Sequence, residues 1–105
     1  MRILHIGDVV GAAGCQFLEK HLPSMKRTHH IDLTIVNGEN SAQGNGITKH
    51  SMEQIFSAGA DVITTGNHCF KRRESLAIYD EPMVLRPANY PDGCVGKGVC
   101  TVDFG

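Results

Sequence analysis

Residues 31–40 read Ile-Asp-Leu-Thr-Ile-Val-Asn-Gly-Glu-Asn, a run of branched apolar residues that ends in a glycine and polar side chains. Branched residues favour strands, so residues 31–36 are predicted to form a buried strand. Two further runs, residues 2–7 and 61–65, are also apolar and also lead into glycine and polar side chains. This recurring form, a buried strand with a polar end, decides the fold.

The segment between the first two runs is predicted to be a helix. A turn over residues 8–14 leads into it, and its apolar residues are expected on one face: Phe17, Leu18 and Leu22. Proline interrupts helical hydrogen bonding, so Pro23 is expected to kink this helix or to start a second short one.

The segment between the second and third runs begins with a loop and continues as a helix. Residues 37–46 are rich in glycine and asparagine and lack apolar periodicity. Thr48 is a suitable N-cap, and Gly59 is a suitable stop. The residues between them carry an apolar stripe, formed by Met52, Ile55 and Phe56.

Alternation of strands and helices predicts the α/β class with a parallel sheet. After residue 70 the pattern weakens, and three shorter elements are expected: a helix over Arg72–Tyr79, a strand over Met83–Leu85 and a strand over Gly98–Phe104. We find no repeat or linker, so residues 1–105 are predicted to belong to a single domain.

The composition argues against several kinds of partner. The chain has 105 residues, a net charge of −1 and 41% apolar residues, without the basic excess that nucleic acids or anionic membranes attract. No apolar run approaches the about 20 residues of a membrane span, and no secretory leader is recognisable. We therefore expect a cytoplasmic protein that does not bind membranes.

The cysteines do not form a zinc site. None belongs to a C-x-x-C pair, and in a cytosolic chain they are expected to be reduced thiols: Cys15, Cys69, Cys94 and Cys100. Cys69 differs from the rest because it directly follows polar residues at the end of the third strand.

The polar strand ends predict a site. In open parallel sheets, ligands bind outside the carboxyl ends of the strands, so all three ends should gather at one edge. They supply two carboxylates, two amides and an imidazole, carried by Asp8, Glu39, Asn40, Asn67 and His68. Hard oxygen ligands with one imidazole suit Mn²⁺, Fe or Mg²⁺ rather than a thiolate-bound zinc.

Each of these residues also has a structural explanation, since an Asp after a strand often caps a helix and Asn-Gly pairs often form turns. Three successive strand ends with the same chemistry favour a metal or phosphate site. A dinucleotide site is the competing interpretation, because Gly7, Gly11 and Gly14 precede a helix, but Val9 occupies the middle glycine position. No P-loop sequence is present.

Four motifs in order resemble those of calcineurin-like metallophosphoesterases, and most closely the YmdB-like family. They are Gly7-Asp8-Val9-Val10-Gly11, Val36-Asn37-Gly38-Glu39-Asn40, Thr64-Thr65-Gly66-Asn67-His68 and Leu85-Arg86-Pro87-Ala88-Asn89-Tyr90-Pro91. The resemblance implies the parallel-sheet half of a metallophosphoesterase α/β sandwich. It also implies a metal-dependent phosphodiesterase that opens 2',3'-cyclic nucleotides at the 2' ester bond.

The resemblance assigns a role to each residue. Asp8 and Asn40 match ligands of a first metal, Glu39 a bridging ligand, Asn67 a ligand of a second metal, and His68 the donor of a proton to the leaving oxygen. Two divalent ions are implied, iron above all, with manganese or magnesium as alternatives. Such a pair stabilises both the attacking and the leaving oxygens at phosphorus, and imidazole is suited to proton transfer near neutral pH.

The chain departs from the family pattern in two ways. Cys69-Phe70-Lys71 follows the Asn-His pair, so a cation stands where an acid is usual. The family's remaining ligands are histidines of a C-terminal half, and we assign none of the histidines here to that role: His5, His21, His29, His30 and His50.

We therefore expect the N-terminal part of the enzyme, inactive alone, which forms homo-oligomers or associates with a complementary C-terminal segment. The alternative is a non-catalytic module that binds a metal or a nucleotide.

Overall fold

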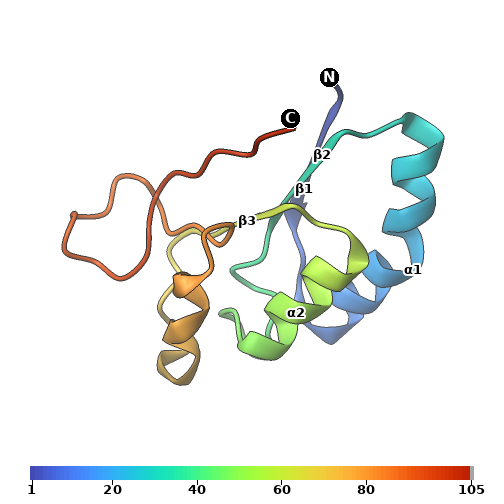
Figure 1. Cartoon of the computed structure of the whole chain (residues 1–105). Helices are drawn as coiled ribbons and strands as arrows, with labels where there is room; N and C mark the ends of the chain where they lie inside the picture. Colours follow the sequence, from blue (N-terminus) through green and yellow to red (C-terminus); the bar gives the residue numbers. More distant parts are fainter. Residues whose placement is uncertain (105) are drawn as a thin grey trace.

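The structure is a computed structural model that describes residues 1–104. Its centre is a parallel three-stranded sheet in the order β1-β2-β3, with β1 at Ile3–Asp8, β2 at Leu33–Asn37 and β3 at Val62–Thr64. Each crossover is a helix, α1 at Gly11–His29 and α2 at Lys49–Ala58 (Figure 1). The predicted α/β class with a parallel sheet is confirmed.

The register of the sheet places the core on one face. Ile6 is paired with Val36, and Val36 with Ile63. Successive side chains of a strand point to opposite faces, so these three share the face that α1 and α2 cover. The largest fully buried apolar residues of this core are Leu22, Ile47, Ile55, Ile63, Val36 and Val84. The helices therefore hold the strands in place and leave the strand ends free at the edge.

Helix α1 corrects two expectations. It continues through Pro23 as one helix of 19 residues, so of the two alternatives for Pro23 the start of a second helix is wrong. Leu22, beside the proline, is only 2% exposed, and burial of such side chains outweighs the one lost hydrogen bond. Phe17 does not share the buried face, since it is 65% exposed and its ring lies 4.2 Å from that of His21.

Helix α2 begins and ends where the sequence predicts. Thr48 and Ser51 form a capping box, in which each side chain bonds the backbone N–H of the other. Gly59 has a φ of 123° and directs its N–H to the last carbonyls of the helix. These two ends fix the position of the loop that precedes α2, which carries part of the candidate site.

The predictions after residue 70 are partly correct. The short helix forms as a 3₁₀ helix, η1 (Arg73–Asp80). The strand over Met83–Leu85 reduces to two isolated bridges, from Val84 to Ile63 and from Leu85 to Lys97. The strand over Gly98–Phe104 is wrong, because a strand requires a neighbour for its N–H and C=O groups and the pairing ends at Lys97.

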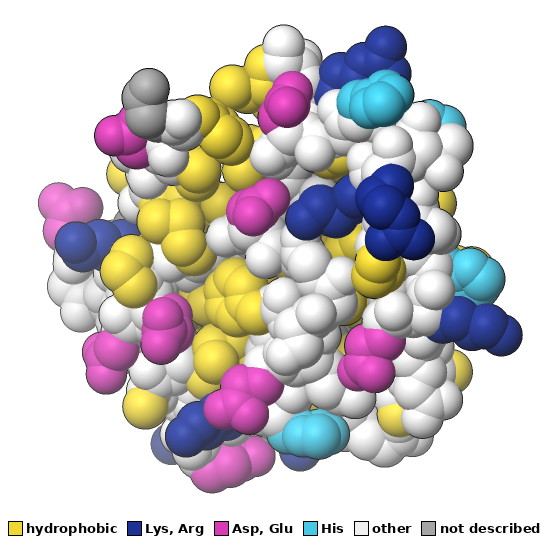
Figure 2. Space-filling view, turned by 45° about the vertical axis from the view of Figure 1, so that its right-hand side comes forward, with side chains coloured by type: hydrophobic (Ala, Val, Ile, Leu, Met, Phe, Trp, Pro, Cys, Tyr) yellow, Lys and Arg dark blue, Asp and Glu magenta, His cyan; other side chains and the backbone are white. Residues whose placement is uncertain are grey.

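The second face of the sheet is only partly covered. Residues 98–104 cross it, as the red end of the ribbon in Figure 1 shows. Between this segment and the sheet lies a groove of about 400 Å³ lined mainly by apolar side chains of both, among them Ile35, Val62 and Val102. Apolar atoms also remain visible between charged side chains in Figure 2. Within residues 1–104, no helix is long and apolar enough to span a membrane.

Candidate metal centre

The carboxyl ends of the three strands meet at one edge of the sheet, and backbone hydrogen bonds hold them there. The amide of Val9 bonds the carbonyl of Asn37 at 3.2 Å, and that of Gly38 bonds the carbonyl of Thr64 at 3.0 Å. The amide of Gly11 reaches the carbonyl of Asn40 at 3.0 Å. The positions of the side chains at this edge therefore follow from the main chain.

The turn that carries Glu39 and Asn40 is anchored to α2. Ser41 Oγ donates to the carbonyl of Gly38 at 2.7 Å and lies 2.9 Å from Ser51 Oγ, a member of the capping box of α2. A side chain at Gly38 would lie 3.1 Å from both Ile55 and Ile63, so glycine lets this turn lie directly on the core.

Four of the five predicted residues form one hydrogen-bonded chain. Asn40 Nδ2 donates to Asp8 Oδ2 at 3.2 Å, and Asn40 Oδ1 lies 2.7 Å from His68 Nδ1. His68 Nδ1 also lies 3.4 Å from Glu39 Oε2, which accepts the backbone N–H of His68 at 3.1 Å. The fold therefore brings together residues up to 60 positions apart, at the edge where the strand ends were predicted to meet.

Asn67 is the exception. It is exposed, and within residues 1–104 it takes no part in the hydrogen bonds that join the other four. It is nevertheless adjacent to His68 in the turn after β3. Its assignment as a metal ligand stays a prediction, as do those of Asp8, Glu39 and Asn40.

The hydrogen bonds define the tautomer of His68. Both oxygens that face Nδ1, from Asn40 and Glu39, are acceptors in this arrangement, because the Asn40 amide nitrogen is used by Asp8. Nδ1 therefore carries a proton, and Nε2 is the nitrogen available for a further proton.

Gly66 determines the space that Glu39 occupies. A Cβ at Gly66 would overlap Glu39 Oε1 and lie 2.9 Å from Glu39 Cδ. The carboxylate thus fits against the backbone of β3's end only because this position has no side chain. The strand-end pattern included Gly66 but gave no sign of this close approach.

The residues after His68 form a buried support. Cys69 is 3% exposed, and burial raises the pKa of its thiol, so it remains protonated rather than acting as a thiolate ligand. The hydroxyl of Tyr79 donates to the carbonyl of Cys69, and Phe70 packs edge-on against Tyr79 at 5.4 Å. Lys71 is exposed. The departure from the family pattern therefore leaves the turn under His68 well packed.

The donor chemistry fits a hard divalent cation, although the donors are few. Asp8, Glu39 and Asn40 offer carboxylate and amide oxygens, the ligands preferred by magnesium, manganese and ferrous iron. Within residues 1–104, no three His, Cys, Asp or Glu side chains come close enough together to hold a metal ion. The set is therefore suited to part of a metal shell.

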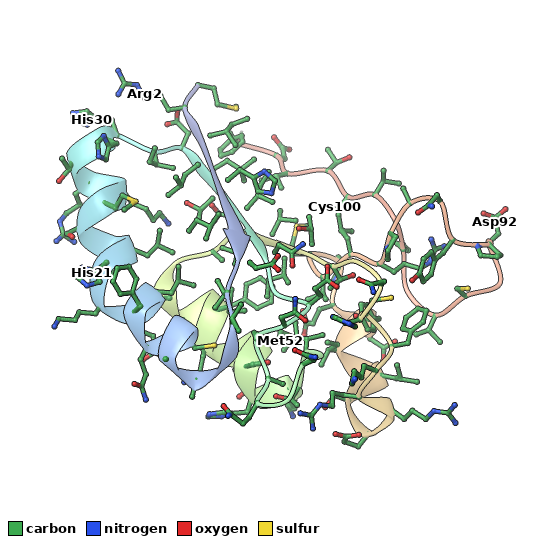
Figure 3. The ribbon with its side chains drawn as sticks, turned by 180° about the vertical axis from the view of Figure 1, so that it is seen from behind. Arg2, His21, His30, Met52, Asp92 and Cys100 are labelled. Atoms are coloured by element: carbon green, nitrogen blue, oxygen red, sulfur yellow. The ribbon has the colours of Figure 1, made fainter. Side chains whose placement is uncertain are left out.

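The other histidines lie elsewhere. His21 and His30 belong to the region of α1, on the side of the molecule away from Asp92 (Figure 3). His5 is exposed in β1, and His29 lies in the last turn of α1. All four cysteines are free, as the sequence predicts.

Fold comparison identifies the class to which this architecture belongs. A solved structure of a hypothetical protein from Thermus thermophilus matches 100% of this chain and 41% of its own, with a TM-score of 0.92 and 39% identity. A novel phosphatase of Mycoplasma pneumoniae matches with a TM-score of 0.88 and 29% identity, over 98% of this chain and 38% of its own. The predicted fold, the parallel-sheet half of a metallophosphoesterase α/β sandwich, is confirmed.

The family follows from the sequence. The model described as YmdB-like protein matches residues 4–105, and the chain belongs to this family. It is 43% identical over 103 residues to the 2',3'-cyclic-nucleotide 2'-phosphodiesterase of Bacillus subtilis (strain 168) and 34% identical over 90 residues to a putative phosphatase/phosphodiesterase of Mycoplasma genitalium. These matches cover 97% and 85% of this chain but 39% and 32% of the relatives, so the chain spans well under half their length.

Proposed function

We propose that this chain supplies part of the active site of a metal-dependent phosphodiesterase that hydrolyses 2',3'-cyclic nucleotides. The observation that carries the proposal is the hydrogen-bonded chain from Asp8 through Asn40 to His68 and Glu39 at the carboxyl ends of the parallel strands. The name of the Bacillus subtilis relative supports the choice of substrate.

His68 is the proton donor in this proposal. Asn40 holds Nδ1 through its carbonyl oxygen, which leaves Nε2 to face the substrate and to give its proton to the leaving 2' oxygen. Glu39 Oε2 lies 3.4 Å from Nδ1 and accepts the backbone N–H of His68, so the carboxylate helps to hold the ring in place. The side chain of His68 is 32% exposed, so a substrate can reach it.

The proposed metal ligands are Asp8, Glu39, Asn40 and Asn67, for two divalent ions, iron or else manganese or magnesium. Bound ions would supply Lewis-acid polarisation of the phosphoryl group and an activated water. An amide oxygen has two lone pairs, so Asn40 is able to face both His68 and a metal. Glu39, with two carboxylate oxygens and little exposure, suits the bridging position.

Completion of the site by further residues is part of the proposal. Divalent iron, manganese and magnesium prefer about six ligands, more than these four side chains provide. We therefore propose that residues 1–105 bind metal weakly, do not turn over cyclic nucleotides alone, and form a single domain only with a C-terminal segment. The half-covered second face of the sheet would receive that segment or a second copy. A cytoplasmic location completes the proposal.

Hydrolysis of 2',3'-cyclic nucleotides by the longer protein, in the presence of Fe²⁺ or Mn²⁺, tests the function. We expect turnover that is abolished in the Glu39→Gln variant, and absence of turnover in the unaltered protein would refute the proposal. Sustained hydrolysis by residues 1–105, sensitive to the same substitution, would refute the statement that this part is incomplete. Metal binding without hydrolysis by the longer protein would favour the non-catalytic module instead.

A further inference from the structure

Arg72 joins two loops that lie far apart in the sequence. It stands at the N-terminal end of η1, directly after the turn that carries His68. Its Nε donates to the carbonyl of Asn45 at 2.9 Å, and its Nη2 donates to the carbonyl of Gln43. Both carbonyls belong to the loop that follows Asn40, so one guanidinium connects the loops that carry Asn40 and His68.

The loop that receives Arg72 has an unusual backbone. Gly44, Asn45 and Gly46 all have positive φ angles, of 79°, 77° and 82°. Two hydrogen bonds close the loop, from the amide of Asn45 to the carbonyl of Ala42 and from the amide of Ala42 to the carbonyl of Gly46. Because the chain turns in this way, the carbonyls of Gln43 and Asn45 point outward together and accept a planar two-pronged donor.

The stem of Arg72 is fitted to the same loop. A side chain at Gly46 would lie 2.7 Å from Arg72 Cγ, so the aliphatic part of the arginine lies directly on this glycine. A Cβ at Gly44 would lie 3.4 Å from Arg72 Nη2. Stem and guanidinium are therefore both received by the loop, in a fork geometry that lysine does not reproduce.

A surface ion pair does not explain this placement. Arg72 Nη1 lies 3.8 Å from Glu74 Oε1, but Glu74 is 66% exposed, and an exposed pair of this length contributes little. The backbone carbonyls, not Glu74, hold the guanidinium.

We propose that Arg72 is a positioning residue for the candidate site, which fixes the loop after Asn40 against the turn after β3 and thereby sets the 2.7 Å contact between Asn40 Oδ1 and His68 Nδ1. Arg72 acts through these two residues and touches no reacting atom. Any effect of Arg72 on catalysis rests on the proposed function, whereas its effect on the contact between Asn40 and His68 concerns the fold alone.

The imidazole nitrogen resonances of His68 report this contact without any assay of activity. At about pH 8 a histidine is largely neutral, and its ¹⁵N shifts distinguish a proton on Nδ1 from one on Nε2. We expect Nδ1–H in the longer protein without substitution. In Arg72→Lys and Arg72→Ala we expect a mixture of tautomers, together with about 10- to 100-fold faster hydrogen exchange at the amides of Ala42 and Asn45.

Arg73→Ala and Glu74→Gln are the matched controls, since Arg73 is a neighbouring exposed arginine and Glu74 is the ion-pair partner. Both should keep the Nδ1–H signal and the slow exchange. Retention of the unaltered spectrum and exchange rates in Arg72→Lys would overturn the proposal, and this conservative variant decides the matter if Arg72→Ala does not fold. If the longer protein hydrolyses no cyclic nucleotide while Arg72→Lys still mixes the His68 tautomers, the proposed function fails and the positioning role of Arg72 stands.

Discussion

Gly66→Ala is the most direct test of how the site is built. The new methyl group would overlap Glu39 Oε1 and lie 2.9 Å from Glu39 Cδ, so the carboxylate must move away. Movement breaks its hydrogen bond with the backbone N–H of His68, which is 3.1 Å long in the structure. We expect both a loss of stability and a change in the environment of His68.

The size of the effect follows from two opposing contributions. Loss of a hydrogen bond to a charged group costs about 1.5–3 kcal/mol. Replacement of glycine by alanine lowers the conformational entropy of the unfolded chain, which stabilises the folded state by about 0.4–1 kcal/mol. The free energy of unfolding should therefore fall by about 0.5–2.6 kcal/mol, a change that leaves a domain of ordinary stability folded.

Gly7→Ala is the matched control, because Gly7 also precedes a site residue at a strand end. A side chain there meets no atom within 4 Å, and the backbone is not left-handed. We expect Gly7→Ala to be neutral or stabilising by about 0.4–1 kcal/mol. Urea unfolding measures both variants, and the amide resonance of His68 reports the lost hydrogen bond. Equal stability of the two variants, with the His68 amide unchanged, would refute the geometry derived for Glu39.

Three further predictions concern metal, catalysis and pH. Glu39→Gln in the longer protein should lose most bound metal while the fold survives, and metal analysis with unchanged stoichiometry would contradict the bridging role. His68→Ala should lower kcat by about 10²–10⁴-fold with metal retained. The loss should be smaller for a substrate with a nitrophenolate leaving group, which needs no proton. Equal losses of kcat for the two kinds of substrate would indicate that His68 only positions the substrate or the metal. Burial raises the pKa of Cys15, Cys69 and Tyr79, so the unfolded chain releases these protons first. Stability should therefore fall as pH rises above the ordinary thiol value of 9.0, and Cys15→Ala with Cys69→Ala should flatten that decline in urea unfolding.

The structure could be predicted from the sequence wherever interactions between residues close together in the chain decide it. The strands before Asp8, Glu39 and Asn67 are short apolar runs, and such runs have few alternatives to a buried sheet. Thr48 and Gly59 delimit α2 because capping depends on residues close together in the chain. The gathering of Asp8, Asn40 and His68 followed from the general rule for parallel strand ends.

The wrong or missed predictions concern residues whose structure depends on contacts with residues distant in the sequence, which no local pattern reveals. Phe17 has the spacing of a core residue, but it lies at the margin of the described core and stays 65% exposed, with its ring against that of His21. Residues 98–104 have a strand-like composition, yet pairing stops at Lys97. The role of Arg72 depends on carbonyls that converge only because three consecutive residues adopt positive φ. The clearance between Gly66 and Glu39 likewise exists only in three dimensions.

Main-chain hydrogen bonds, rather than side chains, hold the three strand ends together. Gly11, Gly38 and Ser41 hold the edge through their backbone amides, so the frame persists whichever side chain stands at positions 8, 40 or 67. Exchange of an amide for a carboxylate there would alter the charge offered to an ion without refolding the support. Such an edge allows donor identity to drift during evolution, or to be redesigned for a different metal, while the architecture that presents the donors stays constant.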